Sequence, residues 1–203
     1  MRSNFFRGAV LLIAAFCLIS ISERSTVQAA GEPSGPVSGK TAFWTMYKSA
    51  YSWSSDAVPL KLESKSISGV KNEGGKAAMW TAIFGSARKR EAIDISYAVA
   101  AQAPDVAKGI NVGHPISWGG PSRDVMPFQG SDIAADSDAA YKTAATLADS
   151  WLKTHPDKQV SFLLGFNTTT FVRPVWVVMW GDKKFGFRAF VDAKTGEIAK
   201  PLK

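Results

Sequence analysis

Two segments of the chain carry the hydrophobic spacing of an amphipathic helix. Apolar side chains recur at intervals of three and four residues in 40–55, and again in 136–155. Asp136 and Ser137 suit the start of the second helix, and Pro156 suits its end. The predicted buried stripes are Phe43, Met46, Tyr47, Ala50 and Tyr51 in the first helix, and Tyr141, Ala144, Leu147, Ala148, Trp151 and Leu152 in the second.

Each predicted helix is followed by segments with the alternating pattern of β-strands. The predicted strands are residues 59–67, 77–84 and 91–99 after the first helix, and residues 158–166, 174–180 and 185–193 after the second. In the third strand, Ile93, Ile95 and Tyr97 alternate with Asp94 and Ser96. This alternation predicts one buried and one wetter face of a sheet.

The two halves of the chain repeat the same order of elements. Trp80 and Gly85 are five residues apart, as are Trp176 and Gly181, and the two pairs are offset by 96 residues. The pattern predicts an α+β fold made of two related helix-plus-antiparallel-sheet units, 40–100 and 132–203. An internal duplication is favoured, and two unrelated units are the alternative.

The last strand and its tail resemble a known family. Trp176, the strand after it, and the segment FVDAKTGEI with Asp192, Gly196 and Glu197 resemble the end of a PepSY-type (peptidase propeptide) module over residues 136–198. The resemblance implies a PepSY- or cystatin-like fold and a secreted, non-enzymatic module that binds or inhibits a partner, often a peptidase. The first half lacks the Asp-x-x-x-Gly-Glu tail, so it would be a degenerate copy.

The start of the chain is typical of a secretory signal peptide. Arg2 and Arg7 precede an apolar run, 8–21, and the small residues Val27 and Ala29 suit cleavage after Ala29. An uncleaved anchor is the alternative. We therefore expect a periplasmic or secreted bacterial protein with a signal peptide over 1–29, a flexible lead over 30–39, and no membrane span after cleavage.

Composition narrows the chemistry of the mature chain. Cys17, the only cysteine, lies in the predicted signal peptide, so disulfides and thiolate sites are excluded after cleavage. The formal net charge is +7, of which Arg2, Arg7, Arg24 and Glu23 contribute +2, leaving +5. The basic residues are scattered rather than clustered, so we do not expect a nucleic-acid partner.

No residue pattern predicts catalysis. His114 and His155 are the two histidines, and no serine sits in a Gly-x-Ser-x-Gly elbow. Asp132, Asp136 and Asp138 are spaced acids that helix capping explains better than calcium binding. We therefore expect a protein that is not an enzyme and has no cofactor and no metal.

The segment 101–131 is rich in Gly and Pro, lacks clean periodicity and is predicted to be a connecting loop. Its candidate partner-binding residues are Trp118, Arg123, Met126 and Phe128, because aromatic residues and arginine are enriched at binding hot spots. Alternatively, these side chains fold back and fill the seam between the halves.

Two functions follow from these patterns. The first is an exported, non-catalytic protein-binding or inhibitory module that acts by surface complementarity on another exported protein, for instance a peptidase. The second is a small-ligand or lipid carrier with its ligand in the cleft between helix and sheet.

Overall fold

The computed structural model describes residues 35–202, so the predicted signal peptide lies outside the described residues. Within these residues there are two α-helices, α1 (Gly39–Trp53) and α2 (Ser137–Thr154), and a short 3₁₀ helix, η1 (Gly130–Asp132). The strands are β1 (Val37–Ser38), β2 (Val58–Lys65), β3 (Lys76–Ala77), β4 (Met79–Ser86), β5 (Glu91–Ala98), β6 (Gly109–Val112), β7 (Ile116–Ser117), β8 (Val160–Gly165), β9 (Val175–Trp180) and β10 (Phe187–Asp192).

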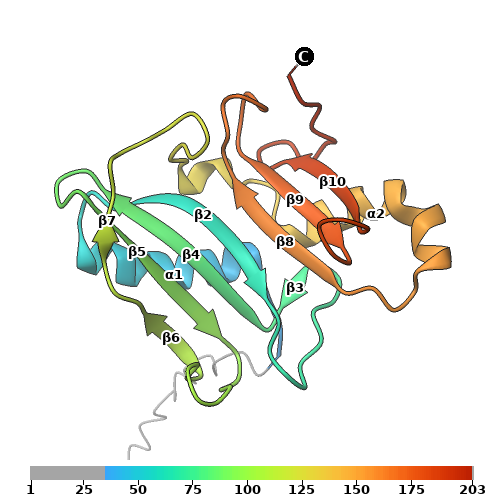
Figure 1. Cartoon of the computed structure of the whole chain (residues 1–203), viewed down its shortest axis with the longest axis horizontal. Helices are drawn as coiled ribbons and strands as arrows, with labels where there is room; N and C mark the ends of the chain where they lie inside the picture. Colours follow the sequence, from blue (N-terminus) through green and yellow to red (C-terminus); the bar gives the residue numbers. More distant parts are fainter. Residues whose placement is uncertain (1–34, 203) are drawn as a thin grey trace, which may run out of the picture. The chain divides into compact units, whose positions relative to one another are not determined.

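Most strands form one antiparallel sheet in the order β10-β9-β8-β2-β4-β5-β6, with β7 also paired to β5 (Figure 1). A separate two-stranded sheet joins β1 to β3. The predicted α+β class is confirmed. No helix among residues 35–202 is long and apolar enough to cross a bilayer.

Two parts of the chain are more ordered than the sequence predicts. Residues 101–131 contain β6 and β7, which supply partners for the backbone groups along the outer edge of β5. In the predicted flexible lead, Val37 and Ser38 pair with β3, and Gly39 begins α1.

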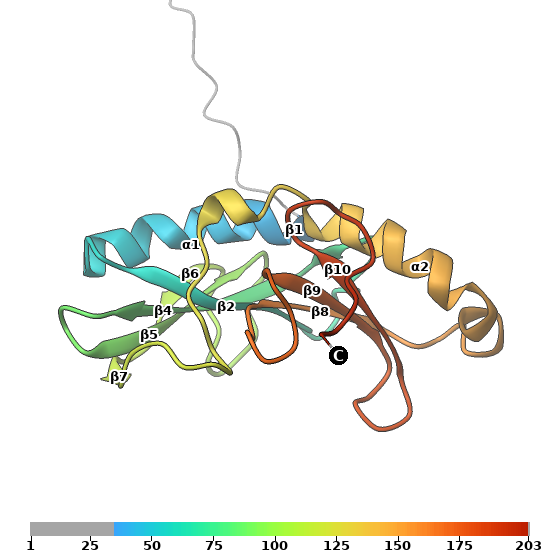
Figure 2. The same cartoon turned by 90° about the horizontal axis from the view of Figure 1, so that it is seen from above.

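Both helices cover the same face of the sheet (Figure 2). Alternate strand residues point toward them and form the core, including Trp80, Phe84, Phe162 and Trp176. We call the opposite face of the sheet, away from the helices, the open face. It is the face seen in Figure 1.

The buried stripe of each helix is narrower than its spacing predicts. Tyr51 and Leu147, both expected in the core, are 56% and 52% exposed. In α2 the fully buried residues are Ser137, Ala140, Ala144 and Ala148, which lie one turn apart. Small side chains on this line let the helix approach the sheet closely, and Leu147 falls to one side of it.

Each half contributes a helix and a three-stranded meander, and the two meanders are joined edge to edge. The first is β2-β4-β5 and the second is β8-β9-β10. Strands β2 and β8 pair antiparallel, with Leu62 opposite Leu164, so the two predicted units share one continuous sheet. This pairing satisfies backbone groups that would otherwise be exposed at two sheet edges. Duplication itself stays a prediction.

The tryptophans of the repeat occupy matching positions at the centre of the molecule. Each indole N–H donates to a carbonyl just before a helix, Trp80 to Val37 and Trp176 to Ala135, both at 2.9 Å. Their ring centroids lie 6.1 Å apart in an edge-to-face arrangement. The tryptophans therefore anchor the starts of both helices at the same place.

The first turns of α1 and α2 meet beside the two tryptophans (Figure 2). Ser137 and Asp136, at the start of α2, accept hydrogen bonds from the first turn of α1. The buried Ser137 hydroxyl accepts from the N–H of Gly39 at 2.7 Å and donates to the carbonyl of Gly75 at 2.6 Å. Asp136 Oδ1 accepts from Lys40 N at 2.8 Å and from Ser137 N at 2.6 Å. One carboxylate thus satisfies free N–H groups at two helix N-termini, where negative charge is favoured.

Candidate functional site

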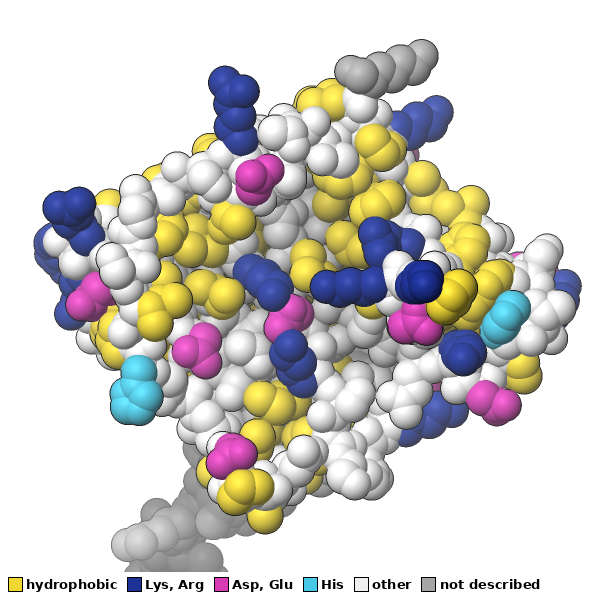
Figure 3. Space-filling view, in the orientation of Figure 1, with side chains coloured by type: hydrophobic (Ala, Val, Ile, Leu, Met, Phe, Trp, Pro, Cys, Tyr) yellow, Lys and Arg dark blue, Asp and Glu magenta, His cyan; other side chains and the backbone are white. Residues whose placement is uncertain are grey.

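The open face carries apolar and charged side chains side by side. Its central charges are Lys61, Glu63 and Lys65, which share the solvent-facing side of β2. In Figure 3, hydrophobic side chains lie on either side of a central group of charged ones. The apolar residues here include Ile83, Leu163, Val175, Val177 and Phe190.

An apolar groove of about 590 Å³ lies on this face. Its floor is formed by β2, β4, β8 and β9, and includes Ile83, Leu163 and Val177. Residues 116–125, which we call the roof segment, and residues 166–171 form its walls. The volume is within the ~300–1,000 Å³ typical of small-molecule sites.

Trp118 is the predicted site residue that faces the groove. It is half-buried, and its ring lies so close to β4 that a Cβ on Gly85 would be 2.8 Å from Trp118 Cζ3. Its backbone N–H donates to Arg90 O at 2.9 Å. The absence of a side chain at Gly85 therefore allows the indole to pack directly on the strand.

The other three predicted residues do not form a surface cluster with Trp118. Phe128 is only 2% exposed, and its ring centroid lies 6.4 Å from that of Phe43 in the core. Its prediction as a surface anchor is wrong, because its backbone bonds to Pro59 O and turns the ring under α1. Met126 is half-buried and Arg123 is exposed.

The roof segment is tied to both halves of the sheet. β7 pairs with β5 at one end, and Met126 N donates to Phe166 O at 2.9 Å at the other. Thr168 N also donates to Arg123 O at 2.9 Å. Val125, Phe166 and Phe171 also line the walls and were not predicted as site residues. Val125 and Phe171 lie outside periodic segments, Phe166 was expected only as the end of a strand, and the three come together only in the fold.

The three charged side chains of β2 carry a surplus of positive charge, and one of them, Lys61, lines the groove. Lys61 Nζ lies 2.5 Å from a Glu63 carboxylate oxygen, and Lys65 pairs with the other oxygen of the same carboxylate. Burial alone would raise the pKa of Glu63, but hydrogen bonds and charge from the two lysines outweigh it and hold that pKa below its ordinary value. Glu63 therefore stays ionised and shared between two cations.

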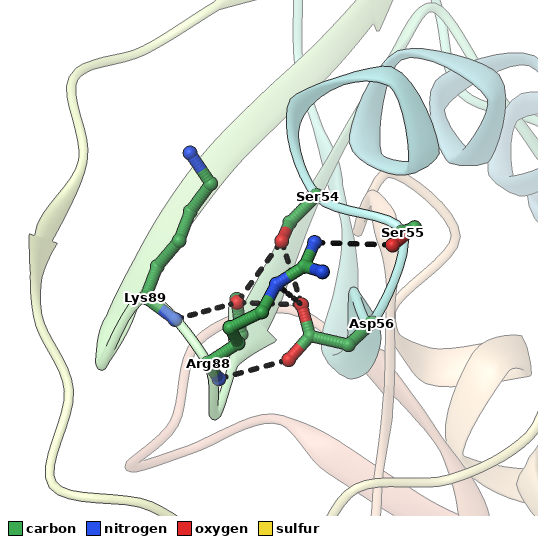
Figure 4. Close-up of polar contacts among 6 residues, drawn as sticks. Ser54, Ser55, Asp56, Arg88 and Lys89 are labelled. Atoms are coloured by element: carbon green, nitrogen blue, oxygen red, sulfur yellow. Dashed lines mark hydrogen bonds and ion pairs between the residues drawn. The ribbon is translucent and has the colours of Figure 1, made fainter.

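A second polar cluster lies at the far end of α1, where two serines surround Asp56 (Figure 4). The Ser54 and Ser86 hydroxyls donate to Asp56 Oδ1 at 2.6 and 2.7 Å, and Arg88 N donates to Oδ2 at 2.9 Å. Ser54 and Ser86 are buried. The cluster ties the end of the helix to the β4–β5 turn.

This cluster is built to hold a charge rather than to activate a serine. Hydrogen bonds from Ser54, from the Arg88 backbone and from Ser86 hold the pKa of Asp56 well below its ordinary value. A carboxylate with so low a pKa is a poor base for removing a hydroxyl proton. A structural role fits this geometry best.

We expect Asp56 to make stability acid-sensitive. Because its pKa is lower in the folded state, its stabilising contribution is present above the unfolded pKa of about 3.9 and is lost as pH falls below that value. Asp56→Asn should lower Tm at pH 7, and the gap to wild type should narrow steadily between pH 4 and pH 2. Thermal melts across this range measure it. Asp149→Asn, which removes an exposed pair with Lys153, is the control and should show little pH-dependent gap. A constant gap for Asp56→Asn would contradict the assignment.

The remaining acidic and histidine candidates have local roles. Asp132 accepts from Gln129 N at 2.8 Å, and Asp136 caps α2, so capping accounts for both. His155 ends α2 and stacks on Trp151 with centroids 4.1 Å apart, whereas His114 is exposed in the loop. Within residues 35–202, no group of three or more His, Cys, Asp or Glu side chains is placed to hold a metal ion.

No protein-family model matches the chain, and no curated protein matches it either. Among solved structures, the chain is similar to the crystal structure of a putative lipoprotein from Clostridium difficile 630. The two share 12% sequence identity at a TM-score of 0.48, over 79% of this chain and 91% of the other. The resemblance to PepSY modules stays a prediction.

Proposed function

We propose that this protein is an exported, non-catalytic binding protein that holds a small apolar ligand in the open-face groove. The observation that carries the proposal is the groove itself, an apolar space of about 590 Å³ with Trp118 in its lining. Burial of apolar surface supplies roughly 25 cal/mol per Å² of binding free energy before the costs of association. Export rests on the signal-peptide pattern at the start of the chain.

The orientation of the loop side chains favours a ligand over a protein interface. Trp118 lies against the sheet and Phe128 is in the core, so the aromatic side chains predicted to anchor a partner point inward. The space between helices and sheet is filled by buried side chains such as Phe43 and Trp80. We therefore assign the carrier function to the opposite face of the sheet rather than to the helix–sheet cleft.

The lining residues support binding without catalysis. Among the described residues that line the groove, Lys61 and Asp124 are the titratable ones. The two serines of the lining, Ser117 and Ser122, come without a histidine in the same lining that would act as a base. An apolar pocket with few polar groups is suited to holding a ligand in place.

Filling the groove should abolish ligand binding. Gly165 lies in the floor, and a Cβ there would meet only Leu163 Cδ2 at 3.6 Å, so a larger side chain would project into open space. We expect Gly165→Phe to weaken binding of the neutral fluorescent probe N-phenyl-1-naphthylamine more than tenfold. Ser161→Phe, on the same strand and face but outside the lining, is the matched control and should change affinity less than twofold.

Either of two results would overturn this function. The first is that the wild-type mature protein shows no saturable binding of the probe, in which case binding of a partner protein to the open face becomes the better hypothesis. The other is equal loss of binding in both phenylalanine variants, which would place the probe elsewhere. Circular dichroism melts establish that both variants fold.

A further inference from the structure

One charged side chain lies in the middle of the groove floor. Cross-strand pairing places Ile83 opposite Lys61, Lys61 opposite Gly165, and Gly165 opposite Val175. The Lys61 side chain is 34% exposed and is therefore partly within the groove and partly in water. Its ammonium group, which is paired with Glu63, belongs to a side chain that lines an otherwise apolar floor.

The ion-pair arrangement leaves room for one added negative charge. Glu63 is paired with Lys61 and with Lys65, so three side chains carry a net charge of +1. Lys65 does not line the groove, whereas Lys61 does. If a ligand anion takes Lys61, Glu63 keeps its pair with Lys65, and every charge in the group is then matched.

The rest of the lining suits an unbranched apolar chain. Leu163, Val175 and Val177 continue the floor across β8 and β9, away from Lys61, and Phe171 closes that side. These residues offer no hydrogen-bonding side chain. Asp124 is the lining carboxylate, and it lies exposed in the roof segment. It would repel an anion next to it, so the anionic end of a ligand belongs at the floor beside Lys61.

We infer that the ligand is a long-chain fatty acid, with its carboxylate on Lys61 and its alkyl chain across β8 and β9. This inference rests on the proposed function and adds the chemical class of the ligand. A single carboxylate supplies the one negative charge that the Lys61–Glu63–Lys65 group lacks. A single alkyl chain matches the part of the groove that is lined by Leu163, Phe171, Val175 and Val177.

Two lysine variants and two ligands distinguish the contribution of charge to ligand affinity from the contribution of apolar contact. Lys61→Met keeps the apolar stem and removes the charge, and Lys65→Met does the same for the other partner of Glu63. Displacement of N-phenyl-1-naphthylamine by palmitate and by hexadecanol, both below their aggregation limits, gives four affinities to compare with wild type.

We expect wild type to bind palmitate at least fivefold more tightly than hexadecanol, and Lys61→Met to weaken palmitate binding about five- to tenfold, as is typical for a partly exposed charge-assisted contact. Hexadecanol affinity should be unchanged in Lys61→Met. Lys65→Met should weaken palmitate binding less than Lys61→Met does, because it removes the surplus charge of the group but keeps the lysine that lines the groove. Shortening the acid should weaken binding by up to about fourfold per methylene.

Equal affinity of wild type for palmitate and hexadecanol would overturn the fatty-acid inference and leave the proposed function standing. Equal loss of palmitate affinity in Lys61→Met and Lys65→Met would likewise overturn the fatty-acid inference and leave the proposed function standing. Failure of wild type to bind the probe, palmitate or hexadecanol would overturn the proposed function as well.

Discussion

Replacing Gly75 by alanine is expected to lower the free energy of unfolding by about 3 kcal/mol, one of the two largest single-residue effects we predict. Gly75 has a φ of +87°, and a Cβ there would lie 2.6 Å from Asp138 N in the first turn of α2. Helix backbone cannot move aside as a flexible side chain can. The substitution therefore combines backbone strain with a clash that forces α2 away from the turn.

The adjacent glycine is a matched control for this prediction. Gly74 also has a positive φ, +57°, but nothing lies within 4 Å of a Cβ built on it. Gly74→Ala should therefore cost only the conformational term, about 1 kcal/mol. Urea unfolding of both variants measures the difference. If the two variants lose the same free energy of unfolding, the close approach of Gly75 to α2 is not the cause of the destabilisation.

Removing the Ser137 hydroxyl should be nearly as damaging. In Ser137→Ala the buried N–H of Gly39 loses its acceptor and the carbonyl of Gly75 loses its donor. Each unsatisfied buried group costs about 1–3 kcal/mol, so we expect a loss of about 3 kcal/mol in the free energy of unfolding. Urea unfolding measures this loss as a change in the midpoint, provided that the m-value is the same for the variant and the wild type.

Thr143 gives the comparison on the same helix. Its hydroxyl donates to Gly196 O at 2.8 Å from a half-buried position, so Thr143→Ala should cost about 1 kcal/mol or less. A loss for Ser137→Ala no greater than this would show that water replaces the hydroxyl. Gly75→Ala and Ser137→Ala disturb the same hydrogen bond, so the double variant should lose less than the sum of the two.

Sequence patterns predicted the elements well where periodicity was strong. The segments 40–55 and 136–155 correspond to α1 and α2, and the alternation in 91–99 corresponds to β5 with Ile93 and Ile95 buried. The matched spacing of Trp80 and Trp176 pointed to equivalent positions. β6 and β7 were missed because they are short, lie among Gly and Pro, and exist through pairing with the distant β5.

The candidate site was largely beyond prediction from the sequence. The strand predicted over 59–67 corresponds to β2, but nothing local indicates that the roof segment forms a wall of a groove on its open face. Of the predicted site residues, Trp118 lines the groove, and Phe128, three residues beyond the end of the roof segment in a similar Gly/Pro context, is in the core instead. The two residues differ in burial because of their tertiary contacts: Trp118 packs on Gly85, and the backbone of Phe128 bonds to Pro59.

The roof segment has a consequence for the history of the protein. Its anchors are β5 in the first half and Phe166 in the second, and the floor beneath it crosses from β4 to β9 over the β2–β8 junction. Neither half alone contains both walls or the whole floor. On the duplication hypothesis, an ancestral single unit therefore had no such groove. The groove would have originated when the two copies became one gene and acquired the segment that connects them, which would make it younger than the fold that carries it.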